Sequence, residues 1–231
     1  MMHEFPELID EALLARAREL SVAQLCDGMK ELDVPGSGCL CMQIGAVDPS
    51  MRVAGTAATV ETGDGDNFPI HVAAYAIPRD GYVMVIDGKG YTDKAYLGDL
   101  IMGAAQAAGY LGVVIDGCTR DREGNIALRF PVFSRGLMPA GPIKKNPGIV
   151  NGEIRCGGIA VRPGDLVVGD YDGVCVVPRG RIAEVLEKAE AKKAYEIKRE
   201  ETIRRYAEAK AKGGPLPQLA PQWVLDLLAK S

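Results

Sequence analysis

Residues 82–116 read YVMVIDGKGYTDKAYLGDLIMGAAQAAGYLGVVID, and this stretch decides the fold. Residues 82–86 are an apolar run of strand length, and residues 113–115 are a second one. Between them, residues 97–108 form an Ala-rich run that predicts a helix ending at Gly109. A strand, a helix and a strand with short connections favour two parallel strands joined by a right-handed crossover.

Each of the two predicted strands leads into a loop that begins with an aspartate. Residues 87–90 (Asp-Gly-Lys-Gly) predict a turn after the first strand, and Asp116-Gly follows the second. Because the carboxyl ends of parallel strands meet at the same edge of a sheet, we expect the loops that begin at Asp87 and Asp116 to lie side by side.

The flanking sequence extends this unit into an α/β fold with a mixed sheet. Residues 4–32 predict two short helices, the second capped by Ser21, and residues 179–212 predict a long charged helix. Further helical and strand patterns cover residues 53–61 (strand), 70–77 (helix), and 131–133, 159–161, 166–168 and 174–177 (short strands of an antiparallel or barrel-like layer). We therefore expect one domain over residues 1–178 and a helical extension over residues 179–231. The last segment of this extension could pack on the same or a neighbouring subunit, because it carries the apolar side chains Trp223, Leu225, Leu227 and Leu228.

The composition excludes several classes of protein. The chain is 47% hydrophobic and 25% charged with a net charge of -4, so we expect no nucleic-acid partner, which a clustered basic face would indicate. No apolar run approaches the roughly 20 residues that cross a bilayer, and the first residues lack the pattern of a signal peptide. These features predict a cytoplasmic protein with no membrane partner. The six scattered cysteines are interpreted as small buried residues.

Two dipeptides carry candidate chemistry. At Gly98-Asp99, where the predicted helix begins, Asp99 can cap the helix while the amides of Leu100, Ile101 and Met102 point outward as an anion site. A plain capped helix is the simpler interpretation of this motif alone. The pair Arg120-Asp121 sets a permanent cation beside a hard oxygen ligand, which suits a divalent ion and a 2-oxo acid, although an isolated Arg-Asp pair is usually a surface contact.

A longer pattern surrounds these dipeptides. It consists of Leu97-Gly-Asp-Leu, Gly109-Tyr-Leu-Gly-Val-Val-Ile-Asp-Gly, Thr119-Arg-Asp, Phe130-Pro-Val-Phe-Ser-Arg-Gly, Cys156-Gly-Gly, Pro163-Gly-Asp-Leu-Val-Val-Gly-Asp and Asp172-Gly-Val. In this order the motifs resemble the family that joins 4-hydroxy-4-methyl-2-oxoglutarate aldolases with the regulators of ribonuclease activity A. The resemblance covers roughly residues 21–178.

The resemblance implies a swivelling β/β/α (RraA-like) domain with a mixed sheet and a central β layer. It also implies a homotrimer or homohexamer with sites between subunits. By matching positions, Asp121 would bind Mg²⁺ or Mn²⁺ directly, Asp99 would hold a metal-bound water, and Arg120 would face the keto oxygen of the substrate.

Further site residues follow from the same resemblance. Gly98 and the amides of Leu100, Ile101 and Met102 would bind the carboxylate of the substrate. A glutamate from the neighbouring subunit's carboxyl-terminal helix would complete the metal site, and both Glu200 and Glu196 qualify. Asn67 and His71 could approach the pocket in the family fold, but rank below Arg120 and Asp121.

The implied function is a metal-dependent carbon-carbon lyase that acts on a small 2-oxo acid. It would cleave 4-hydroxy-4-methyl-2-oxoglutarate to pyruvate and decarboxylate oxaloacetate, both through a pyruvate enolate that the metal and Arg120 stabilise. For the aldol cleavage a metal-ordered water is the candidate base, because no side chain stands out. The alternative is a non-catalytic regulator that binds an RNA-degrading endonuclease, which the other branch of the family implies.

Overall fold

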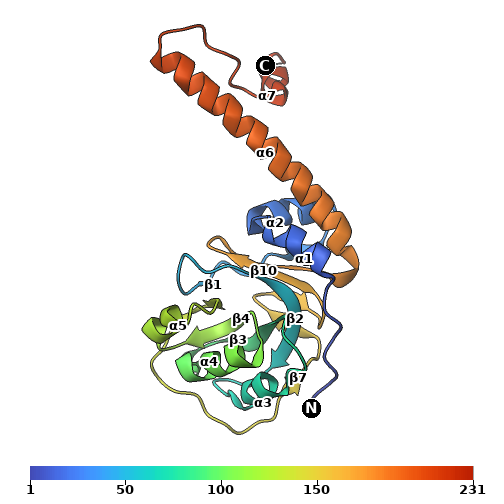
Figure 1. The fold of residues 1–231 in the computed structure, drawn as a ribbon, viewed down its shortest axis with the longest axis vertical. Coiled ribbons are helices and arrows are strands. Elements are labelled where there is room, and N and C mark those ends of the chain that lie inside the picture. Colours follow the sequence, from blue (N-terminus) through green and yellow to red (C-terminus); the bar gives the residue numbers. More distant parts are fainter. Residues whose placement is uncertain (231) are drawn as a thin grey trace. The chain divides into compact units, whose positions relative to one another are not determined.

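The computed structural model describes residues 1–230 (Figure 1). The helices are α1 (Glu11–Arg18), α2 (Val22–Glu31), α3 (Phe68–Ala76), α4 (Asp99–Ala108), α5 (Arg122–Leu128), α6 (Ile182–Ala211) and α7 (Gln222–Leu228), with short 3-10 turns η1 (Pro35–Gly38) and η2 (Arg179–Arg181). The strands are β1 (Gly45–Ala46), β2 (Val53–Glu61), β3 (Tyr82–Leu97), β4 (Gly112–Thr119), β5 (Val132–Ser134), β6 (Gly136–Leu137), β7 (Ile149–Val150), β8 (Ile154–Cys156), β9 (Ile159–Val161), β10 (Leu166–Asp170) and β11 (Gly173–Val177).

A mixed sheet forms the centre of the fold, in the order β1-β5-β4-β3-β2-β10-β11. Strands β2, β3, β4 and β5 run parallel to one another, which confirms the predicted parallel crossover from β3 to β4 through α4. Strand β10 pairs antiparallel with both β2 and β11. The late strands therefore split: β10 and β11 extend the main sheet, while β8 and β9 form a separate hairpin.

The predicted end of the first parallel strand at Asp87 is wrong. Strand β3 passes through the Asp-Gly-Lys-Gly segment and continues to Leu97, because the second half of β4 pairs with it. The turn residues appear instead as local irregularities, with Lys89 and Gly90 at positive φ and shifts of register beyond Ile86. The chain consequently enters α4 directly from β3, through Gly98.

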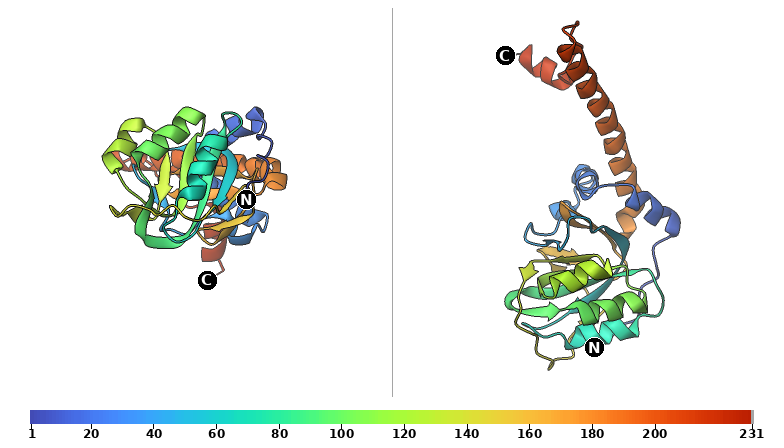
Figure 2. Two further views of the ribbon diagram at one scale, coloured as in Figure 1. Left: turned by 90° about the horizontal axis from the view of Figure 1, so that it is seen from below. Right: turned by 60° about the vertical axis from the view of Figure 1, so that its left-hand side comes forward.

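Helices cover both faces of the sheet. On one face α3, α4 and α5 lie next to one another (Figures 1 and 2). On the other, α1, α2 and the first turns of α6 bury apolar side chains against β10 and β11. The predicted Ser21 cap is confirmed, since its hydroxyl accepts from Gln24 N-H and the Gln24 side chain accepts from Ser21 N-H. None of the helices in the described part of the chain is long and apolar enough to cross a membrane.

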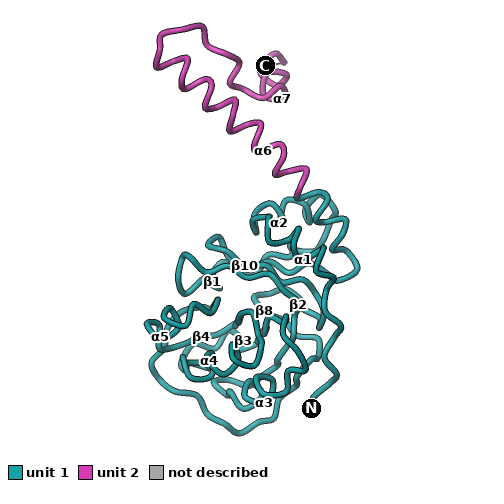
Figure 3. The backbone as a smooth tube through the Cα atoms, in the orientation of Figure 1, with its two compact units in different colours: residues 1–189 teal, residues 190–231 magenta. Residues whose placement is uncertain are grey.

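The chain divides into two compact units, Met1–Ala189 and Glu190–Ser231 (Figure 3). The division falls later than the expected boundary after residue 178, because the first turns of α6 belong to the core of unit 1. Ile182, Val185, Leu186 and Ala189 are buried there. Unit 2 contains the remainder of α6 and α7.

Candidate active site

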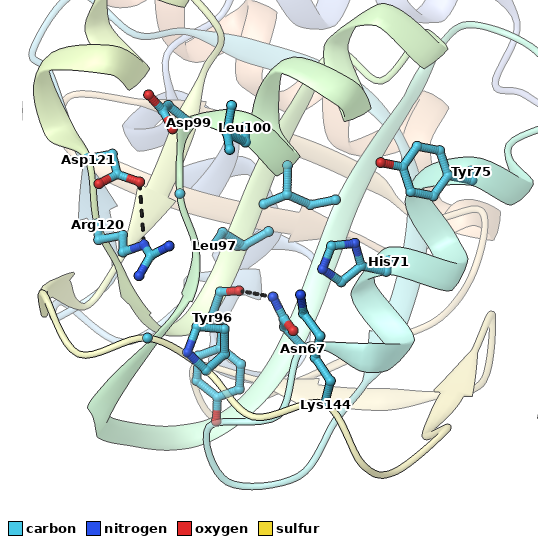
Figure 4. A pocket seen from close by; sticks show the side chains of 14 residues that line it. Asn67, His71, Tyr75, Tyr96, Leu97, Asp99, Leu100, Arg120, Asp121 and Lys144 are labelled. Carbon is cyan, nitrogen blue, oxygen red and sulfur yellow. Dashed lines mark hydrogen bonds and ion pairs between the residues drawn. The ribbon is translucent and has the colours of Figure 1, made fainter.

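The carboxyl ends of β3 and β4 and the amino end of α4 border a pocket of about 380 Å³ in unit 1 (Figure 4). Its lining includes every residue of the Gly98-Asp99 and Arg120-Asp121 dipeptides. The remaining lining residues are Asn67, His71, Tyr75, Tyr96, Leu97, Leu100, Ile101, Gly141, Pro142 and Lys144. The structure thus brings the two predicted dipeptides, which lie 22 positions apart in the sequence, into one cavity.

Backbone hydrogen bonds fix the turn that carries Arg120 and Asp121. Arg120 N-H donates to Leu97 O at 2.9 Å, which ties the end of β4 to the end of β3. The side chain of buried Asn125 donates to Arg120 O at 2.8 Å, and its backbone N-H donates to Asp121 O at 2.9 Å. Asp121 itself adopts the left-handed region at φ 58°, a conformation that costs energy in a non-glycine residue and is common at functional sites.

The two side chains of this pair lie next to each other at the pocket wall. Arg120 Nε is 3.4 Å from Asp121 Oδ2, and the two side chains are 42% and 40% exposed. An ion pair this exposed contributes little to stability. Asp121 directly precedes α5, but its side chain makes no capping hydrogen bond to this helix. The Asp121 carboxylate can therefore bind a ligand in the pocket.

The absence of a side chain at Gly98 leaves the space that the Asp121 carboxylate occupies. A Cβ at position 98 would overlap Asp121 Oδ2 and lie 3.2 Å from Arg120 Cγ and Nε. The φ of Gly98 is -133°, which any residue adopts, so the requirement for glycine comes from the close approach of the side chains. The absent side chain lets Arg120 and Asp121 lie directly against the amino end of α4.

The amino end of α4 differs in two details from the sequence-based expectation. Gly98 occupies the cap position and Asp99 is the first helical residue, so Asp99 does not cap the helix. The Met102 amide donates to Gly98 O at 3.1 Å, so the prediction that it is free is wrong. The amides of Asp99, Leu100 and Ile101 precede this first intrahelical bond, and they form the potential anion site.

Asp99 contributes a second carboxylate to the same wall. Among residues 1–230 its side chain has no hydrogen-bond or ion-pair partner. Gly124 of α5 leaves room for it, because a Cβ at that position would lie 2.5 Å from Asp99 Oδ2. Figure 4 shows Asp99, Arg120 and Asp121 on one side of the pocket.

The opposite wall consists of Asn67, His71, Tyr75 and Lys144 (Figure 4). Asn67 Nδ2 donates to Tyr96 O at 2.9 Å, but its buried Oδ1 has no partner in the part of the chain that the structure describes. Burial and the charge of Lys144 lower the pKa of His71, which favours its neutral form at neutral pH. The structure therefore places both Asn67 and His71 in the pocket.

Lys144 is a pocket residue that the sequence did not reveal. Its loop is held by buried Asp66, whose Oδ2 accepts from Lys145 N-H at 3.0 Å and from Asn146 N-H at 2.9 Å. Asn67 N-H also donates to Ile143 O at 3.1 Å. These contacts join segments about 80 positions apart, so no local pattern around Lys144 could indicate its place.

The carboxylates of Asp121 and Asp99 are ligands of the type that binds a divalent metal ion. Mg²⁺ prefers oxygen ligands and is often held by one or two carboxylates, with waters in its other positions. Asp121 and Asp99 supply two such carboxylates. Within residues 1–230 no three His, Cys, Asp or Glu side chains are grouped to hold a metal. Glu196 and Glu200 lie on α6 in unit 2, and their role as ligands to a neighbouring copy stays a prediction.

Comparisons with known proteins identify the family of the chain. A family model described as RraA-like, aldolase/RraA, matches residues 22–176. A protein of Halalkalibacterium halodurans, provisionally named a 4-hydroxy-4-methyl-2-oxoglutarate aldolase, is 45% identical over 153 residues, which are 66% of this chain and 72% of that protein.

Solved structures show the same fold. An uncharacterized protein from Pseudomonas syringae aligns with a TM-score of 0.70 and 30% identity, over 91% of this chain and 97% of that one. The RNA-processing inhibitor RraA from Thermus aligns with a TM-score of 0.57 and 26% identity, over 65% and 92%. The expected α/β fold of the RraA-like type is thereby confirmed. With a family model that matches most of its length and these relatives, the chain belongs to the RraA-like, aldolase/RraA family.

Proposed function

We propose that this protein is a divalent-metal-dependent carbon-carbon lyase that releases pyruvate from 2-oxo acids of the 4-hydroxy-4-methyl-2-oxoglutarate type and also decarboxylates oxaloacetate. One observation carries the proposal. A single pocket holds a guanidinium group, two carboxylates and the free amides of a helix amino end. The 45% identical relative with an aldolase name supports the same assignment.

The wall formed by Gly98, Asp99 and Arg120 suits the 2-oxo acid end of the substrate. The amides of Leu100 and Ile101 would bind its carboxylate, because a helix amino end favours negative charge. The Arg120 guanidinium would donate to the keto oxygen, where negative charge develops as the carbon-carbon bond breaks. A donor aimed at that oxygen lowers the barrier because it binds the transition state more tightly than the ground state.

The opposite wall suits the rest of the molecule. Both proposed substrates carry a second carboxylate, and Lys144 supplies a cation across the pocket from Arg120. The unpaired Asn67 Oδ1 is an acceptor that the C4 hydroxyl of the aldol substrate could satisfy. Neutral His71 can exchange a hydrogen bond with the same half of the substrate.

A divalent ion, Mg²⁺ or Mn²⁺, belongs to this proposal as the cofactor. Asp121 would bind it directly and Asp99 through a water, and when bound it would act as a Lewis acid toward the oxygens of the 2-oxo acid. Asp121 is held for this role by its backbone bond to Asn125 and by the space at Gly98.

We also propose assembly as a homotrimer or homohexamer in which a neighbouring copy completes the site through Glu196 or Glu200. Apolar side chains at the pocket rim and on the carboxyl-terminal helix support assembly. Leu100 is 88% exposed beside the pocket, and Trp223 and Leu228 of α7 are 62% and 66% exposed. Exposed apolar surface of this kind is typical of protein interfaces. Light scattering on the purified chain measures the number of copies.

The direct test is pyruvate release from 4-hydroxy-4-methyl-2-oxoglutarate and from oxaloacetate, with Mg²⁺ or Mn²⁺ and then with a chelator. We expect turnover above the nonenzymatic rate that falls to background with the chelator. The absence of metal-stimulated turnover for both compounds would overturn the proposal.

The alternative function is that of a regulator, as the name of the Thermus relative suggests for that protein. A regulator of this kind would bind an RNA-degrading endonuclease through protein contacts and would not need a catalytic pocket. Stoichiometric co-purification with such an endonuclease, together with no pyruvate release, would favour it.

A further inference from the structure

A buried carboxylate adjoins the pocket wall that contains Lys144. Asp66 is 0% exposed and does not itself line the pocket. Its Oδ1 accepts from Phe68 N-H at 2.9 Å. Its Oδ2 accepts from Lys145 N-H at 3.0 Å and from Asn146 N-H at 2.9 Å. Three backbone donors from two segments of the chain therefore meet on one side chain that solvent does not reach.

The backbone is held on both sides of Lys144. The residue before it, Ile143, makes two backbone hydrogen bonds with the segment 65–67, at 2.8 and 3.1 Å. The residue after it, Lys145, donates its N-H to the Asp66 carboxylate. The first two bonds join backbone to backbone, whereas the third depends on a side chain. A substitution of Asp66 therefore removes one of the two anchors next to Lys144.

The other oxygen of Asp66 holds the start of α3. Phe68 is the first residue of this helix, and the cap residue Asn67 makes no capping hydrogen bond through its own side chain. Asp66 thus accepts one of the helix amides that the cap leaves without a partner. Helix α3 carries His71 and Tyr75 into the pocket (Figure 4). One carboxylate consequently joins both parts of this wall.

The pattern of donors requires two acceptor oxygens at position 66. A carboxylate accepts at both oxygens, whereas an amide has one acceptor oxygen and one NH₂ group that donates. In Asp66→Asn, the amide oxygen can accept either from Phe68 or from the loop that contains Lys144, but not from both. The variant therefore keeps the size of the side chain and breaks the link between α3 and this loop.

We propose that Asp66 is a positioning residue of the candidate active site, which holds Lys144 where it binds the second carboxylate of the substrate. This inference rests on the proposed function, in which the substrate is a 2-oxo acid with two carboxylates. The turn that carries Arg120 and Asp121 is held separately, by Leu97 and Asn125. Loss of Asp66 should therefore weaken substrate binding and spare the chemical step.

Steady-state kinetics with oxaloacetate test the proposal in Asp66→Asn. A charge-assisted contact is lost from substrate binding, so we expect KM to rise about tenfold and kcat to change by less than about twofold. The matched control is Asp64→Asn, which removes the same charge from an exposed position of the same loop and should keep the wild-type KM. An unchanged KM in Asp66→Asn would overturn the proposal.

Pyruvate distinguishes a loss of positioning from a general loss of structure. It has the 2-oxo acid end of the substrate and lacks the second carboxylate, so the exchange of its methyl hydrogens with D₂O does not need Lys144. We expect the exchange rate of Asp66→Asn, followed by NMR, to stay within about twofold of wild type. Exchange that slows as much as oxaloacetate turnover would contradict a positioning role.

A double-mutant cycle shows whether Asp66 acts through Lys144. Lys144→Ala alone should raise the KM for oxaloacetate at least as much as Asp66→Asn does. When Asp66→Asn is added to Lys144→Ala, KM should rise by less than about twofold further, because the anchor has no cation left to position. If the two effects multiply instead, Asp66 does not act through Lys144.

Amide hydrogen exchange of the wild-type chain tests the anchor without catalysis and without a variant that must fold. The side chains of Lys145 and Asn146 are exposed, but their amides donate to a buried carboxylate. We expect both amides to exchange at least about tenfold more slowly than in an unstructured peptide. Unprotected amides would refute the anchor. Protected amides in a wild-type protein that releases no pyruvate would refute the proposed function, and with it the role of Asp66 in substrate binding.

Discussion

Replacement of Gly98 with alanine probes the site through a single methyl group. The new Cβ would overlap Asp121 Oδ2 and lie 3.2 Å from Arg120 Cγ and Nε. The backbone at this position is extended, with φ -133°, and accepts alanine without strain. The atoms that must move are the ends of two side chains that are 42% and 40% exposed. The substitution therefore displaces the proposed metal ligand and the proposed cation while the fold is kept.

The size of the effect follows from this geometry. To reach ordinary contact with a methyl group, the Asp121 carboxylate must shift by about 1 Å or more. A misplacement of about 1 Å in a catalytic group can cost on the order of a hundredfold in rate, or about 2.7 kcal/mol. The cost in folding stability should stay below about 1 kcal/mol, since partly exposed side chains can move into solvent.

The assay is the initial rate of pyruvate release with Mn²⁺, measured together with thermal unfolding. Gly103→Ala in the same helix is the matched control. Its Cβ would meet Leu128 Cδ2 at 3.6 Å, an ordinary contact, and alanine favours a helix over glycine by about 0.5–1 kcal/mol. We expect Gly103→Ala to keep its activity and Gly98→Ala to lose it at similar unfolding temperature. A fully active Gly98→Ala would refute the role assigned to this wall.

Three further predictions concern residues around the same pocket. Arg120→Ala should lower kcat/KM for pyruvate release by about a hundredfold or more with little change in unfolding temperature, because its ion pair is exposed; wild-type kinetics in this variant would exclude its role. Asn125→Ala should lower the free energy of unfolding by about 1–3 kcal/mol and also reduce activity, since it leaves Arg120 O without its buried donor; urea titration and the pyruvate assay measure both. Burial and the charge of Lys144 lower the pKa of His71 in the folded protein below its unfolded value of 6.5. The neutral His71 side chain therefore contributes to the stability of the folded protein above pH 6.5, and this contribution is lost as the pH falls below 6.5. Wild type should therefore lose more stability than His71→Gln between about pH 7 and pH 5 in urea titrations, and equal losses would contradict this.

Local patterns predicted the central part of the fold. The apolar runs of β3 and β4 and the Ala-rich α4 each have a period and length that belong to one element type, and their order defines a parallel crossover. The continuation of β3 beyond Asp87 could not be predicted, because it depends on pairing with the second half of β4. Its Asp-Gly-Lys-Gly segment has the local composition of a turn.

In the candidate site, too, local sequence patterns could indicate some residues and not others. Arg120 and Asp121 could be found because they directly follow a buried strand within a recognisable motif. Lys144 could not, since its position depends on the distant Asp66, which holds its loop. The Met102 amide was misassigned by one residue, because the helix begins at Asp99 and its first bond already uses that amide. The exact start of a helix is among the least certain features of a sequence pattern.

We expect Asp121, beside Arg120, to support metal-dependent release of pyruvate. The most direct test is the initial rate of pyruvate release from 4-hydroxy-4-methyl-2-oxoglutarate at saturating Mn²⁺ for wild type and for Asp121→Asn, which preserves the shape of the side chain and removes its charge. We expect metal-stimulated turnover in wild type and a loss of about a hundredfold or more in Asp121→Asn. Equal metal-stimulated rates in the two proteins, or no stimulation in wild type, would contradict it.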